Sequence, residues 1–254
     1  MKLQKAVLVL WLPVGILALW QILASQQILN ALFFPAPTLV LSAGWGMLKS
    51  GELGTQVGAT LSRMFTGAGI GALLGLACGL AMGAAAPVRR SLEPIVSALN
   101  STPKLALLPM LMLFTGIGET ARIVPIALSC FIQLAMHGLD AVRSVNQAYI
   151  ELARNYGARR GSMLRRVYLP ASLPQIFTGL RLALGRALVL TISVEMLSST
   201  NGLGSMIWMA WQTFSTDKLY IGIFAAAILG ALTHNGLRWA EVRLLPWGNR
   251  LDRA

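Results

Sequence analysis

The feature that most limits the fold of this chain is a long stretch without any charged side chain, from residue 64 to residue 88. A helix needs about 20 consecutive apolar residues to cross the hydrocarbon core of a bilayer, and this stretch is longer than that. Residues four apart lie on one face of a helix, so a regular spacing of four predicts a seam. Small residues along such a seam let another helix backbone approach closely. Glycine recurs here at every fourth position: Gly67, Gly71, Gly75, Gly79 and Gly83.

The composition extends this interpretation to the whole chain. Of the 254 residues, 56% are hydrophobic and only 12% are charged, and the mean hydropathy is +0.66. Soluble domains carry about 25% charged residues, so this chain has too little polar surface for a water-soluble globule. Disorder is excluded as well, because disordered chains are poor in apolar residues. The composition therefore predicts an all-α, polytopic membrane protein, with residues 1–254 forming a single transmembrane domain.

Apolar runs along the chain predict about six membrane-spanning helices. The first run follows a basic start, but no small-residue cleavage pattern follows it, which favours an uncleaved helix over a signal peptide. Between the first two spans, residues 38–48 predict an amphipathic helix lying at the membrane surface. Residues 198–218, with two tryptophans, predict a segment at the outer interface. The predicted spans cover residues 6–24, 64–88, 95–118, 123–139, 173–197 and 219–237.

The basic residues predict the orientation of the chain, because Lys and Arg collect in cytoplasmic loops. If both termini are cytoplasmic, the outer segments hold only Lys49, Arg63, Arg122 and Lys218. Most of the net charge of +12 then reflects topology, so it does not indicate nucleic-acid binding. The inner segments hold 14 of the 21 basic residues: Lys2, Lys5, Arg89, Arg90, Arg143, Arg154, Arg159, Arg160, Arg165, Arg166, Arg238, Arg243, Arg250 and Arg253.

The residue patterns that bind ATP or a metal are missing from the sequence. A P-loop needs a lysine directly after a glycine, so that the lysine reaches the phosphates, and no lysine here follows a glycine. Cys78 and Cys130 lie in apolar runs, and His137 and His234 are isolated, so no metal site is expected. We therefore expect no cofactor and no enzymatic activity in this chain. Its energy must come from a partner subunit or from an ion gradient.

The longest inner segment, residues 140–172, is more than a simple connector. Helix-forming residues dominate up to Tyr156, Gly157 breaks the helix, and a short basic helix follows that we expect to end at Leu169-Pro170. Such a helix-turn-helix offers an apolar face that a soluble partner could bind. A hairpin held to acidic lipid by its arginines is an equal alternative from physical chemistry alone.

The residues of this segment resemble a known motif, the EAA loop of ABC importer permeases, with the pattern E-A-A-x3-G-x9-I-x-L-P. Leu152 replaces the first alanine of that pattern and Val167 replaces the isoleucine. By this resemblance the loop couples the permease to its ATPase. The residues that match the motif positions are Glu151, Leu152, Ala153, Gly157, Val167, Leu169 and Pro170.

Further landmarks are similar to the nitrate/sulfonate/taurine/bicarbonate branch of these permeases. The sequence departs from that branch in the sixth span, where His234-Asn235 stands in place of a frequent acidic residue. The landmarks are Phe34-Pro35-Ala36-Pro37, Thr60-Leu61-Ser62-Arg63, Leu108-Pro109, Gly116-Ile117-Gly118-Glu119, Gly179-Leu180-Arg181, Glu195-Met196 and Gly202-Leu203-Gly204.

The resemblance implies a permease subunit with the type I ABC importer fold, in the bacterial cytoplasmic membrane. Two permease copies, expected to be a homodimer, would form the pathway in the lipid bilayer. A cytoplasmic ATP-binding subunit and an extracytoplasmic solute-binding protein would complete the importer. The expected solute is a small anion of the nitrate, sulfonate, taurine or bicarbonate type, and a thiamine precursor also stays open. The alternative is a gradient-driven secondary transporter, although the chain shows neither internal repeats nor a mid-membrane acidic residue.

Residues in the interrupted third span are the first candidates for the translocation path. Pro103 and Pro109 free backbone carbonyls, which is tolerated in a membrane where they face protein or a wet cavity. Lys104 lies between them, at a position where a charge is costly unless it faces protein or water. An anionic solute would be attracted to this lysine.

Charged residues of the fifth span are further candidates for the path. Arg181 and Arg186 either line the pathway or extend to the cytoplasmic face. Glu195, near the outer end, either lines the pathway or pairs with Arg122 or Lys218 at the interface.

Overall fold

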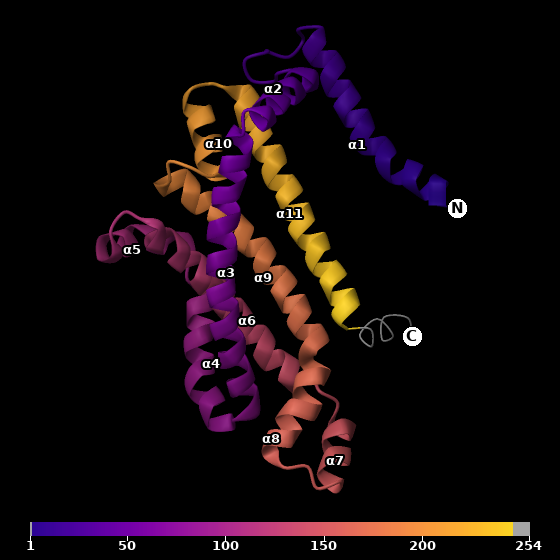
Figure 1. The fold of residues 1–254 in the computed structure, drawn as a ribbon, viewed down its shortest axis with the longest axis vertical. Coiled ribbons are helices and arrows are strands. Elements are labelled where there is room, and N and C mark those ends of the chain that lie inside the picture. Colours follow the sequence, from indigo (N-terminus) through magenta and orange to yellow (C-terminus); the bar gives the residue numbers. More distant parts are fainter. Residues whose placement is uncertain (1, 246–254) are drawn as a thin grey trace. The chain divides into compact units, whose positions relative to one another are not determined.

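The computed structural model describes residues 2–245, and every regular element in this part of the chain is helical (Figure 1). The all-α prediction is confirmed. The elements are α1 (Lys2–Ser25), α2 (Pro37–Lys49), α3 (Glu52–Ala84), α4 (Ala86–Ser101), the 3-10 helix η1 (Lys104–Leu107), α5 (Leu108–Thr115), α6 (Glu119–Arg143), α7 (Gln147–Asn155), α8 (Arg160–Met163), the π-helix η2 (Leu164–Tyr168), α9 (Leu169–Ser198), α10 (Leu203–Gln212) and α11 (Thr216–Leu244).

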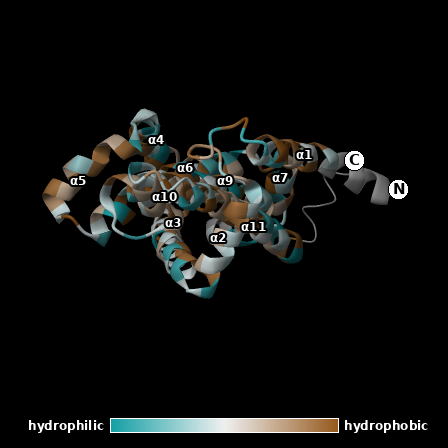
Figure 2. Cartoon of the chain, turned by 90° about the horizontal axis from the view of Figure 1, so that it is seen from above, coloured by the Kyte–Doolittle hydropathy of each residue, from teal (hydrophilic) through white to brown (hydrophobic). Residues whose placement is uncertain are grey.

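Three of the described helices, α3, α6 and α11, are both long enough and apolar enough to cross a membrane. The pair formed by α4 and η1–α5 makes a fourth if it counts as one broken span. The predicted first and fifth spans are also helices. The apolar part of α1 with described side chains is short, Trp11–Ser25, and the 30-residue α9 carries three charged side chains. Large apolar side chains are exposed along many helices, as expected of lipid-facing surfaces. Figure 2 shows hydrophobic residues, coloured brown, on many of these helices.

The predicted third span is not one straight helix. Its two parts, Ala86–Ser101 and Lys104–Thr115, are bent by 91° at the break between them. Thr102 has an extended backbone, with ψ of 133°, because the ring of Pro103 excludes the helical conformation at the preceding residue. The predicted interruption at Pro103 is thus a sharp corner.

The second predicted span begins earlier than expected, at Glu52 instead of residue 64. Its first turns are polar, so the apolar run alone does not reveal them. Arg63 is only 4% exposed and pairs with Glu119 at the start of α6, which satisfies its charge inside the protein. Arg63, which was predicted to lie in the outer segment just before the span, is therefore part of the same helix.

The chain forms two compact units, and three helices continue covalently from one unit to the other. One unit contains residues 1–59 and 195–227, and the other contains residues 60–194 and 228–254.

In the first unit, aromatic and polar contacts join α1, α3 and α10 to the start of α11. The ring of Trp20 packs against Tyr220 with centroids 5.1 Å apart. Lys218 pairs with Glu52 at 3.0 Å, and the side-chain oxygen of Gln56 accepts a hydrogen bond from the backbone of Gly202.

In the second unit, the glycine seam of α3 packs against another helix, as predicted, and that helix is α6. A Cβ added at Gly67 would lie 2.8 Å from the Cβ of Ile126. Added Cβ atoms at Gly71, Gly75 and Gly79 would meet backbone atoms of α6. Next to this seam, buried residues of α3, α4 and α6 form a hydrophobic core: Met82, Val96, Ile132, Ala135 and Leu139.

Candidate functional site

The predicted helix-turn-helix between the fourth and fifth spans is present. The side chain of Asn146 caps α7 by accepting a hydrogen bond from the backbone N–H of Ala148 at 2.9 Å. After α7, Gly157 has a φ of +73°, a left-handed conformation that strongly favours glycine. The backbone N–H groups of Gly157 and Ala158 donate to the last carbonyls of α7, which closes the turn.

The end of the second short helix differs from the prediction. Leu169-Pro170 does not terminate it, because α8, η2 and α9 follow one another without a non-helical residue. Pro170 lies in the first turn of α9, directly after the π-helical segment. A proline removes one hydrogen bond of an α-helix and crowds the carbonyl four residues earlier, and the wider π-turn fits such a position.

A small hydrophobic core packs the helices of this loop together. Val145, Ile150 and Met163 are buried together, and Ala153 and Val167 pack against them. Residues that are distant in sequence therefore hold α7 against α8 and η2. The helical path from α8 through η2 into α9 is continuous.

A pocket of about 580 Å³ lies in the loop. The motif residues Leu152, Ala153, Val167 and Pro170 line it, whereas Glu151, Gly157 and Leu169 do not. Its lining residues are Tyr149, Leu152, Ala153, Tyr156, Arg166, Val167, Pro170 and Ala171.

Three of these lining residues form an exposed apolar face on α7 and its C-cap, the kind of face predicted for the helix-turn-helix, and two of them, Tyr149 and Tyr156, lie outside the motif positions. Tyr149, Leu152 and Tyr156 are 60%, 56% and 86% exposed. Their spacing of three and four residues places them on one side of the helix, and this spacing could have identified the face from the sequence.

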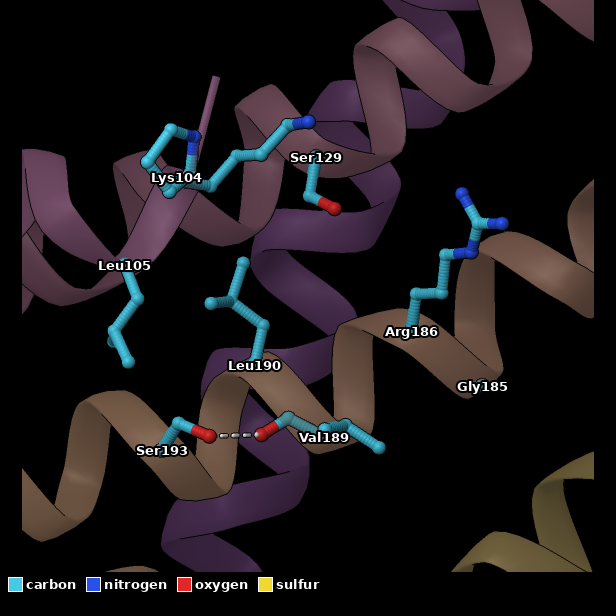
Figure 3. Close-up of a pocket in the computed structure, with 9 residues that line it drawn as sticks. Lys104, Leu105, Ser129, Gly185, Arg186, Val189, Leu190 and Ser193 are labelled. Carbon is cyan, nitrogen blue, oxygen red and sulfur yellow. Dashed lines mark hydrogen bonds between the residues drawn. The ribbon is translucent and has the colours of Figure 1, made fainter. Parts of the chain in front are cut away.

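A second pocket, of about 490 Å³, involves the interrupted third span (Figure 3). Lys104 of η1, Ser129 of α6 and Arg186 of α9 contribute its polar side chains together with Ser193. The remaining lining residues are Pro103, Leu105, Gly185, Val189 and Leu190.

The structure separates the predicted path residues into two groups. Pro103 and Lys104 line this pocket, while Pro109, Arg181 and Glu195 are not among its lining residues. Arg181 instead forms an ion pair with Glu241 of α11. The assignment of these residues to a translocation path stays a prediction.

Glu195 is fully buried, and its Oε2 accepts a hydrogen bond from the backbone N–H of Gly204 at 3.0 Å. Arg122 forms an ion pair with Glu119 at 2.6 Å, and Lys218 forms one with Glu52. Glu195 thus occupies a buried position with a backbone N–H directed at its carboxylate, and its assignment to the path stays a prediction.

Within the described residues, no group of three or more His, Cys, Asp or Glu side chains is arranged to hold a metal ion. One pocket is lined by two cations, two serine hydroxyls and apolar residues, and the other is lined mainly by apolar and aromatic side chains.

The sequence of the helical region identifies the protein family. Residues 71–244 match the family described as the binding-protein-dependent transport system inner membrane component, and this match covers more than half of the chain. The chain belongs to this family. It is thus a permease component of an ABC transport system and a multi-pass protein of the inner membrane. The predicted permease family and the predicted membrane location are confirmed.

Curated relatives of this permease cover nearly its whole length. The taurine transport system permease protein TauC of Escherichia coli strain K12 is 37% identical over 237 residues, which is 91% of this chain and 86% of TauC. SsuC of Bacillus subtilis strain 168, named for the transport of aliphatic sulfonates, is 32% identical over 243 residues, 96% of this chain and 88% of SsuC.

The fold of the permease is also that of a solved importer. It matches a chain of the MetNI methionine ABC transporter in an inward-facing conformation with a TM-score of 0.66, at 22% sequence identity. The match covers 76% of this chain and 94% of that chain. The predicted importer-permease fold is confirmed.

Proposed function

We propose that this permease conducts a small sulfonate-type anion, delivered by an extracytoplasmic solute-binding protein, and is driven by a cytoplasmic ATP-binding subunit. Two copies of the chain form the pathway as a homodimer. The solute class is supported by the names of the relatives TauC and SsuC and by the cations that line the pocket at Lys104. The driving subunit is supported by the loop between α6 and α9.

The observation that carries the proposal is the exposed apolar face of α7 and its C-cap, which lines the loop pocket together with motif residues. Tyr149, Leu152 and Tyr156 leave a large apolar area exposed on a loop rich in arginine. Such a surface is typical of a protein interface, where aromatic side chains supply much of the binding energy. Glu151, at the edge of this face, is exposed and in reach of a partner's cation.

The proposed mechanism uses the loop as a lever. ATP shifts the conformation of the transporter only by binding one arrangement of the ATP-binding subunits more tightly than the other. The small core around Ile150 moves with the partner, and the continuous helix from α8 to α9 carries this motion to the residues of α9 that line the pocket at Lys104. Both termini and this loop are cytoplasmic, as the basic residues favour.

The test replaces Gly157 by Asp, which adds bulk and charge at the turn of the loop. Nothing lies within 4 Å of a Cβ there, so the folded-state cost is the left-handed backbone, about 1 kcal/mol. We expect normal insertion and abundance, with loss of binding to the ATP-binding subunit and loss of uptake. Pull-down of that subunit and solute uptake are measured on the same membranes, and the mass of the wild-type complex should correspond to two permease copies.

Gly51→Asp is the matched control. Gly51 also has a positive φ, of +78°, and no atom within 4 Å of an added Cβ, but it lies in the turn between α2 and α3. It should retain partner binding. Full partner binding and uptake by Gly157→Asp would contradict the proposal and favour the lipid-bound hairpin. Uptake that needs an ion gradient and no ATP-binding subunit would favour the secondary transporter.

A further inference from the structure

The pocket at the corner between α4 and α5 brings two cations from different elements to one cavity. Lys104 extends from η1 and Arg186 from α9, and both side chains line the same space (Figure 3). The nine lining residues include no aspartate or glutamate. The cavity is therefore positively charged and otherwise largely apolar.

Within the described residues, these two charges are not neutralised by a counter-charge. Lys104 donates to the backbone carbonyl of Asn100, and Arg186 donates to the side-chain oxygen of Gln133. Both acceptors are neutral. In the part of the chain that the structure describes, neither cation pairs with a carboxylate.

Another arginine of the same helix shows that the chain can neutralise such a charge. Arg181, five residues before Arg186, pairs with Glu241 of α11. Arg186 instead donates a hydrogen bond to the amide oxygen of Gln133, which orients the guanidinium without cancelling its charge. A cationic side chain without a counter-charge in a predicted membrane span is costly, which makes it a functional candidate.

A hydroxyl donor completes the arrangement. Ser129 of α6 lines the pocket near the ammonium of Lys104, and its hydroxyl makes no hydrogen bond to the described residues (Figure 3). The hydroxyl of Ser193, by contrast, donates to the carbonyl of Val189 at 2.9 Å. Ammonium, guanidinium and the Ser129 hydroxyl thus offer donors from three elements to one ligand.

We infer that Lys104, Arg186 and Ser129 form a binding site for the anionic head group of the transported solute, a sulfonate. A sulfonate carries one negative charge over three oxygens that only accept hydrogen bonds, and it would meet one donor from each element. The cavity of about 490 Å³ is in the size range of small-molecule sites, and its apolar walls suit a short alkyl chain. This inference rests on the proposed function, because it names the contact for the same solute.

The experiment measures binding of ethanesulfonate to the purified transporter complex in phosphatidylcholine nanodiscs by calorimetry, without the solute-binding protein. Ethyl methyl sulfone, of similar shape but without charge, is the matched probe. We expect the wild type to bind ethanesulfonate and not the sulfone. Lys104→Gln and Arg186→Gln should each weaken binding by about tenfold, since a charge-assisted hydrogen bond is lost.

Gln133→Glu tests the same charge without removing the arginine. The new carboxylate would face Arg186 and compete with the solute, so binding should weaken while the complex stays intact. Lys49→Gln and Arg90→Gln each remove a cation from outside the pocket and should leave binding unchanged.

Equal affinity in wild type and all pocket variants would overturn the inference, as would absence of ethanesulfonate binding by the wild type. An anionic lipid headgroup presents similar oxygens. If Lys104 and Arg186 retain phosphatidylglycerol and do not affect ethanesulfonate, the site binds lipid and the inference fails. Co-purification of the ATP-binding subunit is scored on the same samples, so failure of the proposed function is recognised separately.

Discussion

At the level of single residues, the ion pair between Arg181 and Glu241 fastens α9 to α11. Both side chains are partly buried, 25% and 22% exposed, and the Nε of Arg181 is buried without a partner among the described residues. The pair also shows why two arginines of one helix have different roles: one has a carboxylate and the other faces a pocket.

Removing one member of this pair should destabilise the protein more than removing both. Arg181→Met leaves the Glu241 carboxylate partly buried without a partner, and Glu241→Met does the same to the arginine, whereas the double variant leaves no charge. We expect a coupling free energy of about 1–3 kcal/mol from thermal unfolding in detergent. The exposed pair Lys218–Glu52 serves as the comparison and should give less than about 1 kcal/mol. Additive single effects at Arg181 and Glu241 would show that the pair contributes nothing.

Prediction of single residues from the sequence was most accurate within a spaced motif. It was least accurate for residues whose role depends on contacts with distant parts of the chain. Gly157 was predicted to turn the loop, and its positive φ confirms that role. Arg181 and Arg186 were predicted for the path together, because nothing in a sequence shows that Glu241 lies near Arg181 or that Arg186 lines a pocket. Ser129 and Gln133 were missed, since an uncharged polar residue in a membrane helix is not distinctive until its neighbours are known.

At the level of elements, the α3–α6 contact depends on the absence of side chains. We predict that Gly71→Ala destabilises the protein by about 1–3 kcal/mol, because the added Cβ would overlap the carbonyl of Ala127 and lie 2.8 Å from the Cβ of Cys130. The backbone of α6 cannot move aside as a flexible side chain would. Thermal unfolding of the purified protein in detergent gives the measurement.

Gly69→Ala is the control on the same helix. Nothing lies within 4 Å of a Cβ at Gly69, so this change should be neutral or stabilise by up to about 1 kcal/mol through the better helix propensity of alanine. Equal unfolding temperatures for the two variants would mean that the glycine spacing has no role in packing.

Apolar runs predicted where helices lie but not how they begin, bend or join. The first turns of α3 were not predicted, because the charged Arg63 stands directly before the apolar run and predicts a boundary there. Its ion pair with Glu119 becomes apparent only in the structure. The proline before Lys104 predicted a break, and the 91° bend depends on packing that the sequence does not display. The π-helical junction before Leu169 was not predicted, because prolines most often end a helix.

At the level of the whole molecule, the distribution of basic residues predicts one orientation in the membrane. In a variant with both native cysteines replaced by alanine, we expect Ser50→Cys to react with a membrane-impermeant maleimide added to intact spheroplasts. Arg159→Cys should react only after the membrane is permeabilised, because its loop faces the cytoplasm. Both positions are exposed, so access decides the outcome. The opposite labelling pattern would show that the topology is inverted. The loop would then lie outside the cell, where it could not contact a cytoplasmic ATPase.

The glycine seam has one more consequence, for the way this chain tolerates changes of length. An α-helix turns by about 100° per residue, so one residue inserted between Gly71 and Gly75 would rotate all later glycines away from α6. In the part of the contact that follows the insertion, side chains would then face the backbone of α6. The number of residues in this part of α3 is therefore fixed, whereas the connection before Glu52 can lengthen or shorten. Among natural variants of this permease, insertions and deletions should cluster in that connection and be absent from the segment between Gly67 and Gly83.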